Sequence, residues 1–241
     1  MVASQLIENK IAGMKPTKIF TIRDLDFPMD WWKNVRVKLG RMVKSGLIEK
    51  VGKGKYYKPQ LSAFGNIGPS SDEMVKDLMY DNGALSGYLT GYTVWNRMGL
   101  TSQISNVIII GTSRRRDALR RGNYEIRFMT QPNRVTSGSI PLLQILDSLK
   151  QIKQIPDTTI DQSVRILRKH IANLDARMLP TLVKLARKYP PRVRALLGAI
   201  LESIGNNDYI GELKQSLNPM SSYEMGLSNL PEMNLKNWGI R

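Results

Sequence analysis

The chain has 241 residues with a hydrophobic content of 41%, enough for two modest domains that each bury a core. Its 36 lysines and arginines outnumber 20 aspartates and glutamates, and the resulting formal net charge of +16 favours polyanionic partners, nucleic acid first. The absence of cysteine excludes disulfides and thiolate metal sites. The sequence shows no signal peptide and no apolar run of roughly eighteen residues, which predicts a cytoplasmic protein without a membrane span.

The first domain is predicted to span residues 1–60 and to be a winged helix-turn-helix. Residues 30–46, DWWKNVRVKLGRMVKSG, place apolar side chains on one helical face, and residues 46–59, GLIEKVGKGKYYKP, read as two short strands around a Gly-Lys-Gly tip. An upstream helix at SQLIENKIAG and a short strand at KIFTIRDLDF complete the order helix, strand, helix, basic helix, hairpin. In proteins with this order, the second helix of the pair enters the major groove and the hairpin lies along the DNA backbone.

The basic residues of this domain gather on helix 30–46 and on the hairpin. Residues 1–60 hold thirteen lysines and arginines against five acidic residues, a net charge of +8. The expected DNA contacts are Lys33, Asn34, Val37, Lys38, Arg41, Lys44, Lys50, Lys53 and Lys55. The glycines on either side of Lys53 let the backbone approach phosphate, which the lysines neutralise. A winged helix that contacts only protein is the alternative interpretation.

A linker and a larger second domain are predicted to follow. Residues 61–72 are rich in Pro, Gly, Ser and Asn without an apolar period, which is typical of a linker. Residues 73–205 are expected to form a mixed α/β, mostly helical domain, so that the whole chain is of the α+β class. The expected elements are helices at 73–80 and 85–98, strands at 107–110 and 124–132, and helices at 140–156, 160–171, 180–189 and 191–204. Residues 206–241 show little charge and no period, and their role is unknown.

Two features of the second domain stand out. Gly83, Gly87 and Gly91 are spaced by four in GALSGYLTG, a pattern that permits tight helix contact or a broken helix. The segment SRRRDALRRGNYEIR is dense in arginine, and we expect it to form a second phosphate-binding surface through Arg114, Arg115, Arg116, Arg120 and Arg121. A solvated loop between two strands is the alternative.

Groups that could carry catalysis are sparse. His170 is the only histidine, and its helical context ILRKHIANL is typical of a surface or half-buried residue. One histidine without cysteine cannot assemble a zinc site, and the carboxylates lack the close pairing of a two-metal site. The sequence therefore predicts a protein without catalysis, metal or cofactor.

Several segments resemble one known family. The strings LGRMVKSGLIEKVGKGKYYKP, GYLTGYTVWNRMGLTSQISNVIIIGTSRRR, LLQILDSLKQIKQIPD and KYPPRVRALLGAILESIG are similar to antitoxins of AbiE-type abortive-infection systems, in a branch common in Bacteroidetes. The resemblance covers roughly residues 2–205 and implies an N-terminal winged helix that represses its own operon by binding inverted repeats. It also implies a C-terminal domain that counteracts a nucleotidyltransferase-like toxin without requiring a stable complex. By resemblance, Lys33, Asn34, Lys38 and Arg41 lie on the recognition helix and Lys53 at the wing tip.

The function expected from these features is that of a sequence-specific, DNA-binding transcriptional repressor and type IV toxin–antitoxin antitoxin. Two alternatives stay open. One is an RNA- or tRNA-associated effector or toxin-side enzyme, because winged helices also bind RNA. The other is a protein-interaction scaffold whose basic face meets an acidic partner.

Overall fold

The structure is a computed structural model that describes residues 3–63, 65–228 and 230–241, and it is of the mixed α+β class. Contacts along the chain divide it into two compact units. The first unit comprises Met1–Leu78 and Ala118–Ile126, and the second comprises Met79–Asp117 and Arg127–Arg241. The expected boundary between residues 72 and 73 is therefore replaced by a division after Leu78, with a short return of the chain to the first unit.

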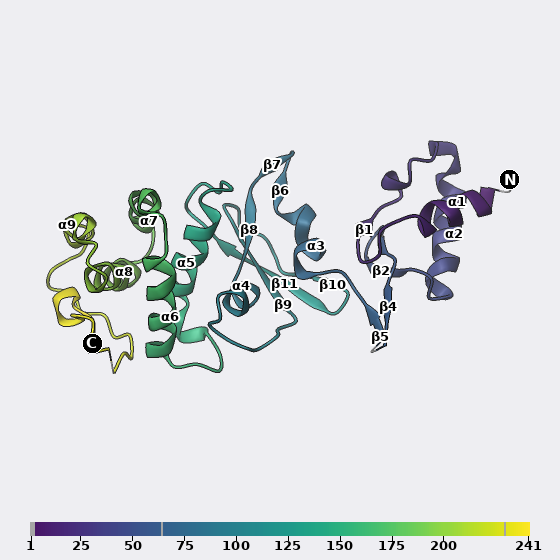
Figure 1. Ribbon diagram of the computed structural model, residues 1–241. Helices are drawn as coiled ribbons and strands as arrows, with labels where there is room; N and C mark the ends of the chain where they lie inside the picture. Colours follow the sequence, from purple (N-terminus) through teal and green to yellow (C-terminus); the bar gives the residue numbers. More distant parts are fainter. Residues whose placement is uncertain (1–2, 64, 229) are drawn as a thin grey trace. The chain divides into compact units, whose positions relative to one another are not determined.

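The first unit begins with a small helical and antiparallel fold. Its elements are α1 (Ala3–Ala12), β1 (Ile19–Phe20), 3-10 turns at Arg23–Leu25 and Met29–Trp31, α2 (Trp32–Lys44), β2 (Glu49–Gly52) and β3 (Lys55–Tyr57). The three strands form one sheet in the order β1-β3-β2, in which Tyr57 pairs with both Ile19 and Glu49. The expected basic helix and the expected hairpin are both present, and α1 packs against α2 (Figure 1).

The core of this fold follows from the apolar spacing. Val35, Leu39 and Met42 recur at three- and four-residue intervals on α2 and are buried against Ile7 and Ile11 of α1. Phe20, Leu25 and Ile48 complete the buried cluster. Burying one stripe of α2 in this way leaves its opposite stripe on the surface.

The expected linker 61–72 contains regular structure. Strands β4 (Gln60–Ser62) and β5 (Gly65–Ile67) pair as an antiparallel hairpin, and α3 (Ser71–Val75) follows at once. The Ser70 side chain caps α3 by accepting a hydrogen bond of 3.3 Å from the Glu73 backbone N–H. The stretch predicted as a linker therefore contains a β-hairpin and the beginning of a helix.

The second unit opens with strands where the sequence indicated a helix. Its first elements are β6 (Tyr80–Asp81), β7 (Ala84–Leu85), β8 (Gly87–Thr90), the short helix α4 (Tyr92–Arg97) and β9 (Val107–Thr112). Strand β8 runs antiparallel to β9, and β9 is the neighbour of β11 (Tyr124–Thr130) in the sheet. The start of β11 pairs with β10 (Leu119–Arg121) within the first unit.

The prediction of a helix at 85–98 holds only for Tyr92–Arg97 and was wrong for residues 85–90, where close packing between strands requires glycine. A Cβ atom at Gly87 would lie 3.1 Å from the Ile110 side chain, and a Cβ at Gly111 would lie 2.6 Å from the Tyr88 ring. Gly91 adopts a φ of +67°, which L-residues rarely take, directly before α4. Of the three glycines spaced by four, Gly87 and Gly91 therefore lie against residues of β9, whereas Gly83 adopts a φ of +79° between β6 and β7.

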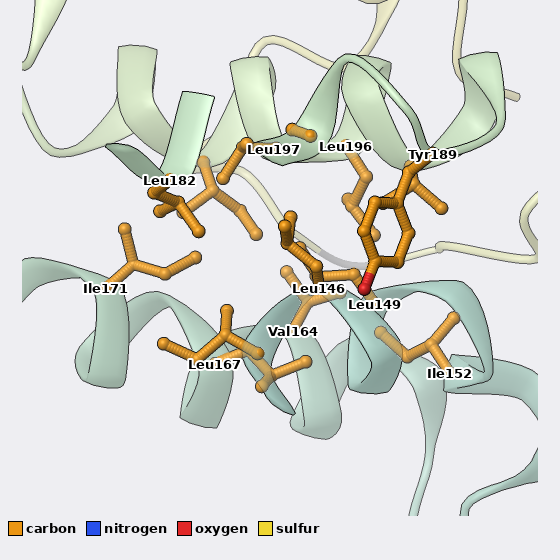
Figure 2. Packing of buried hydrophobic residues seen from close by; sticks show 14 of the residues in the cluster. Leu146, Leu149, Ile152, Val164, Leu167, Ile171, Leu182, Tyr189, Leu196 and Leu197 are labelled. Carbon is orange, nitrogen blue, oxygen red and sulfur yellow. The ribbon is translucent and has the colours of Figure 1, made fainter. Parts of the chain in front are cut away.

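The remainder of the second unit is largely helical, and the four expected helices are confirmed as α5 (Ile140–Lys150), α6 (Ile160–Ala172), α7 (Leu179–Ala186) and α8 (Pro191–Ser203). A fifth helix, α9 (Ile210–Gln215), lies in the segment where the sequence indicated no element. Figure 2 shows Leu146, Leu149, Val164, Leu167 and Leu196 directed into one shared core. This core is what the amphipathic spacing of these helices predicts.

The C-terminal segment 206–241 belongs to that core. Trp238 and Ile240 are each 3% exposed, and the Trp238 indole N–H donates a hydrogen bond of 2.8 Å to Glu202 of α8. The backbone N–H of Tyr223 donates to the Gly239 carbonyl over 2.7 Å, which closes the segment on itself. Its role is therefore structural, although it shows no period in the sequence.

Gly198→Ala is expected to destabilise the second unit. The added Cβ would lie 2.1 Å from the Trp238 ring, so the ring must leave its place in the core. Overpacking of this kind costs about 1–3 kcal/mol. Thermal or urea unfolding measures the loss, with Gly211→Ala as the control, because nothing lies within 4 Å of a Cβ at that helical position. Equal stability of the two variants would contradict the assigned packing of Trp238.

Candidate nucleic-acid interface

The exposed stripe of α2 is the centre of the candidate interface. Lys33, Val37, Arg41 and Lys44 follow one another at three- and four-residue intervals and are all exposed, with Asn34 beside them. No acidic residue occurs in α2. We call these five residues the α2 stripe. It presents three cations, one amide and one apolar side chain to any ligand that approaches this face.

Two further side chains change the predicted set on this helix. Lys38 lies at the margin of the helix, where it forms an ion pair with Glu8 of α1 and is only 17% exposed. In the structure Lys38 therefore links the two helices, and its expected role as a DNA contact stays a prediction. Arg36 is exposed and was absent from the predicted contacts, although its position three residues after Lys33 on a face without acids could have indicated it.

The hairpin β2–β3 carries the second group of cations. Lys50 and Lys53 are exposed, and Lys53 lies in the turn between Gly52 and Gly54. Gly54 has a φ of +69°, and a Cβ atom at Gly52 or Gly54 would meet nothing within 4 Å. The tip is consequently narrow and open, which leaves the backbone free to approach a ligand.

An aspartate clamps this hairpin to the returning segment 118–126 within the first unit. Asp77 accepts a hydrogen bond of 2.7 Å from Lys55 and one of 2.8 Å from Arg121, which also donates 2.7 Å to the Met74 carbonyl. The Gly122 backbone N–H donates 3.1 Å to the Val51 carbonyl of β2. Arg121 is only 7% exposed. Lys55 and Arg121 therefore hold the fold together. Burial corrects the expected role of Arg121 as a DNA contact, whereas the expected contact of Lys55 stays a prediction.

The clamp shifts the acidity of Asp77. Partial burial raises the pKa of this carboxyl group, but the hydrogen bonds and charges of Arg121 and Lys55 outweigh burial and lower the pKa to about 2. A carboxyl group whose pKa is lower in the folded chain stabilises the fold above its ordinary pKa of 3.8. That contribution is lost as the pH falls from about 4 towards 2.

Asp77→Asn is expected to reduce the acid sensitivity of the first unit between pH 4 and pH 2. The variant should be less stable than the wild type at pH 7, because the amide lacks the charge that pairs with Arg121 and Lys55. The difference should shrink towards pH 2, because protonation of Asp77 removes the same charge from the wild type. Melting temperatures across this range measure the effect. Asp26→Asn is the control, since Asp26 is exposed and asparagine tolerates its φ of +54°. If Asp77→Asn and Asp26→Asn gave the same pH profile, the clamp would not act as described.

The arginine-rich segment is divided between the two units. Arg120 lies exposed on β10 in the first unit, where β10 contacts β2. Arg114, Arg115 and Arg116 belong to the second unit, where Arg114 pairs with Asp81 over 3.0 Å and Arg116 lies 5.5 Å above the Phe128 ring. Contacts within the chain thus relieve part of the repulsion expected among these three arginines, and Arg115 is left exposed.

A buried polar network in the second unit was not foreseen from the sequence. Asp147 of α5 is 1% exposed and accepts hydrogen bonds from Tyr88 (2.6 Å), Tyr189 (2.7 Å) and Thr90 (3.0 Å). The Gln131 amide donates to both tyrosine oxygens over 2.7 Å. Burial raises the pKa of Asp147, although its three donors act in the opposite direction. We assign this closed network a structural role, because its members satisfy one another.

Other potential chemistry in the described chain is limited. The His170 ring Nε2 lies 2.9 Å from the Met98 carbonyl oxygen, a contact within the second unit. In the part of the chain that the structure describes, no three His, Cys, Asp or Glu side chains are placed to hold a metal ion. Among the same residues, no helix is long and apolar enough to cross a bilayer.

Comparisons with known proteins give a fold and a family match. The RV2827C protein from Mycobacterium tuberculosis has a similar crystal structure, with a TM-score of 0.65 at 10% sequence identity over 99% of this chain and 90% of that one. No curated protein sequence matches the chain. Residues 6–174 match a family model described as a family of unknown function, DUF6088.

Proposed function

The chain belongs to the DUF6088 family, whose function is unknown, and we propose that its first unit is a winged helix-turn-helix that binds operator DNA as a sequence-specific repressor. The observation that carries the proposal is the α2 stripe, an exposed helical face with cations and without carboxylates. The order helix, strand, short helical turns, helix and hairpin supports it, because winged helices share that order.

In the proposed complex α2 lies in the major groove. The Asn34 amide suits a paired contact to adenine, and Val37, which is 52% exposed, suits the methyl group of thymine. Lys33, Arg41 and Lys44 neutralise flanking phosphates. The hairpin follows the backbone, where Lys50 and Lys53 add phosphate contacts.

We further propose that the protein is the antitoxin of a type IV toxin–antitoxin system, acting in the cytoplasm. This part rests on the resemblance to AbiE-type antitoxins rather than on the α2 stripe. It assigns the protein an autoregulated operon with inverted repeats and a nucleotidyltransferase-like toxin encoded nearby. No stable complex between the two proteins is required.

A reporter experiment tests the regulatory proposal. A reporter gene behind the DNA upstream of this gene should be repressed when the protein is supplied from a plasmid, and repression should be lost when Lys33, Arg41 and Lys44 are replaced. Expression together with the neighbouring gene should restore growth that the neighbour alone inhibits. Growth inhibition by this protein alone would favour an RNA-directed effector, and an unrepressed reporter would contradict autoregulation.

A further inference from the structure

The second unit contains an open cleft of about 720 Å³ that the proposed DNA contacts do not use. Its charged lining residues are Arg134 and Lys188, and no carboxylate lines it. A volume between about 300 and 1,000 Å³ is typical of small-molecule sites. The cleft therefore offers a space of suitable size with a net positive lining.

Hydrogen bonds between buried residues fix the loop that carries Arg134. The Asn133 backbone N–H donates 2.9 Å to the Gln131 side chain, and the Asn133 amide donates 3.1 Å to the Leu185 carbonyl. Gln131 and Asn133 are 1% and 4% exposed, and Gln131 is a member of the buried Asp147 network. The backbone at Arg134 is thus positioned before any ligand arrives, which lowers the entropic cost of binding.

The cations keep donors available for a ligand. Lys188 donates one hydrogen bond of 3.1 Å to the Pro132 carbonyl, which leaves two further ammonium protons. The exposed Arg134 guanidinium makes no hydrogen bond or ion pair to residues 3–63, 65–228 and 230–241. The hydroxyl groups of Ser113 and Ser137 also line the cleft. Together these groups match the acceptor oxygens of a phosphate.

The remaining wall is apolar. Leu85, Pro132 and Val135 line the cleft beside the cations. A site that combines an apolar wall with a few polar or charged groups suits an organic ring that carries an anionic group. Inorganic phosphate alone would leave that wall uncovered, whereas a nucleotide would cover it with its base.

We propose that this cleft binds a free nucleotide, with the phosphate on Arg134 and Lys188 and the base against Leu85, Pro132 and Val135. The site is separate from the α2 stripe and involves a different ligand. Nucleotide binding there is a second activity of the chain, beyond operator binding.

Isothermal titration of the full chain with each of the four ribonucleoside monophosphates tests the proposal. At least one should bind with a Kd below about 1 mM, and its nucleoside and inorganic phosphate should each bind at least about tenfold more weakly. Arg134→Gln should weaken the nucleotide at least about tenfold, because it removes a charge-assisted contact. Its melting temperature without ligand should equal that of the wild type, since Arg134 has no side-chain partner in the described chain.

Two control variants distinguish nucleotide binding in the cleft from a general effect of positive charge and from binding by the first unit. Lys184→Gln removes one exposed cation of α7 outside the cleft and should leave nucleotide binding unchanged. Replacing Lys33, Arg41 and Lys44 by glutamine should likewise leave it unchanged, and Arg134→Gln should keep full operator affinity. The proposal is overturned if no monophosphate binds with a Kd below about 1 mM, if Lys184→Gln weakens binding as much as Arg134→Gln, or if only an oligonucleotide binds.

Discussion

Replacement of Lys33, Arg41 and Lys44 by glutamine is expected to lower the affinity for duplex DNA by at least roughly a hundredfold at physiological salt. Each lost charged contact removes about 1.5–3 kcal/mol in favourable geometry. Each lost phosphate neutralisation also reduces the slope of log K against log salt by about 0.9, so the slope should fall by close to three units. Glutamine keeps the helix propensity of α2, so the fold should be preserved.

A matched variant controls for net charge. Lys10, Lys15 and Lys76 are exposed cations of the first unit outside the α2 stripe and the hairpin. Their replacement by glutamine removes the same charge and should cost much less affinity. Salt titrations of fluorescence anisotropy compare the two variants. Equal losses would mean that DNA responds to the general field of the protein rather than to α2.

Asp147→Ala is expected to destabilise the second unit by about 3–5 kcal/mol, because buried donors that lose their acceptor cost about 1–3 kcal/mol each. The change removes the acceptor of three hydroxyl groups, from Tyr88, Tyr189 and Thr90, in a part of the core that water does not reach. It also leaves a cavity beside α5. Equilibrium unfolding in urea measures the loss.

Tyr189→Phe is the graded comparison for this network. It removes one of the three donors and keeps the ring, so the cost should be near 1–2 kcal/mol. The variant Asp147→Ala should unfold well before Tyr189→Phe in the same titration. A loss below about 1 kcal/mol for Asp147→Ala would show that the network contributes little.

The helices were predictable wherever burial follows a local period. The spacing of Val35, Leu39 and Met42 on α2 predicts both the buried face and the exposed stripe opposite to it. The same holds for α5 to α8, whose apolar residues recur at helical intervals. These features depend only on residues that are close together in the sequence, so a single sequence is enough to predict them.

Features that depend on distant partners were not predictable. In the sequence Arg121 has the features of an exposed cation, but in the structure it pairs with Asp77, which lies 44 residues earlier. Asp147 receives donors from three other segments, and Trp238 fits over Gly198 only because the chain returns to α8. Strand pairing around Gly87 and Gly111 is likewise nonlocal, and it overrode the apparent helical spacing.

The most direct test of sequence-specific DNA binding is the ratio of two dissociation constants. The first is measured on the duplex upstream of this gene, and the second on a shuffled duplex of the same length and composition, both at about 150 mM salt. If α2 reads base edges, the upstream duplex should bind at least about a thousandfold more tightly, as specific sites generally do. A ratio near one would contradict sequence-specific recognition, whatever the absolute affinity.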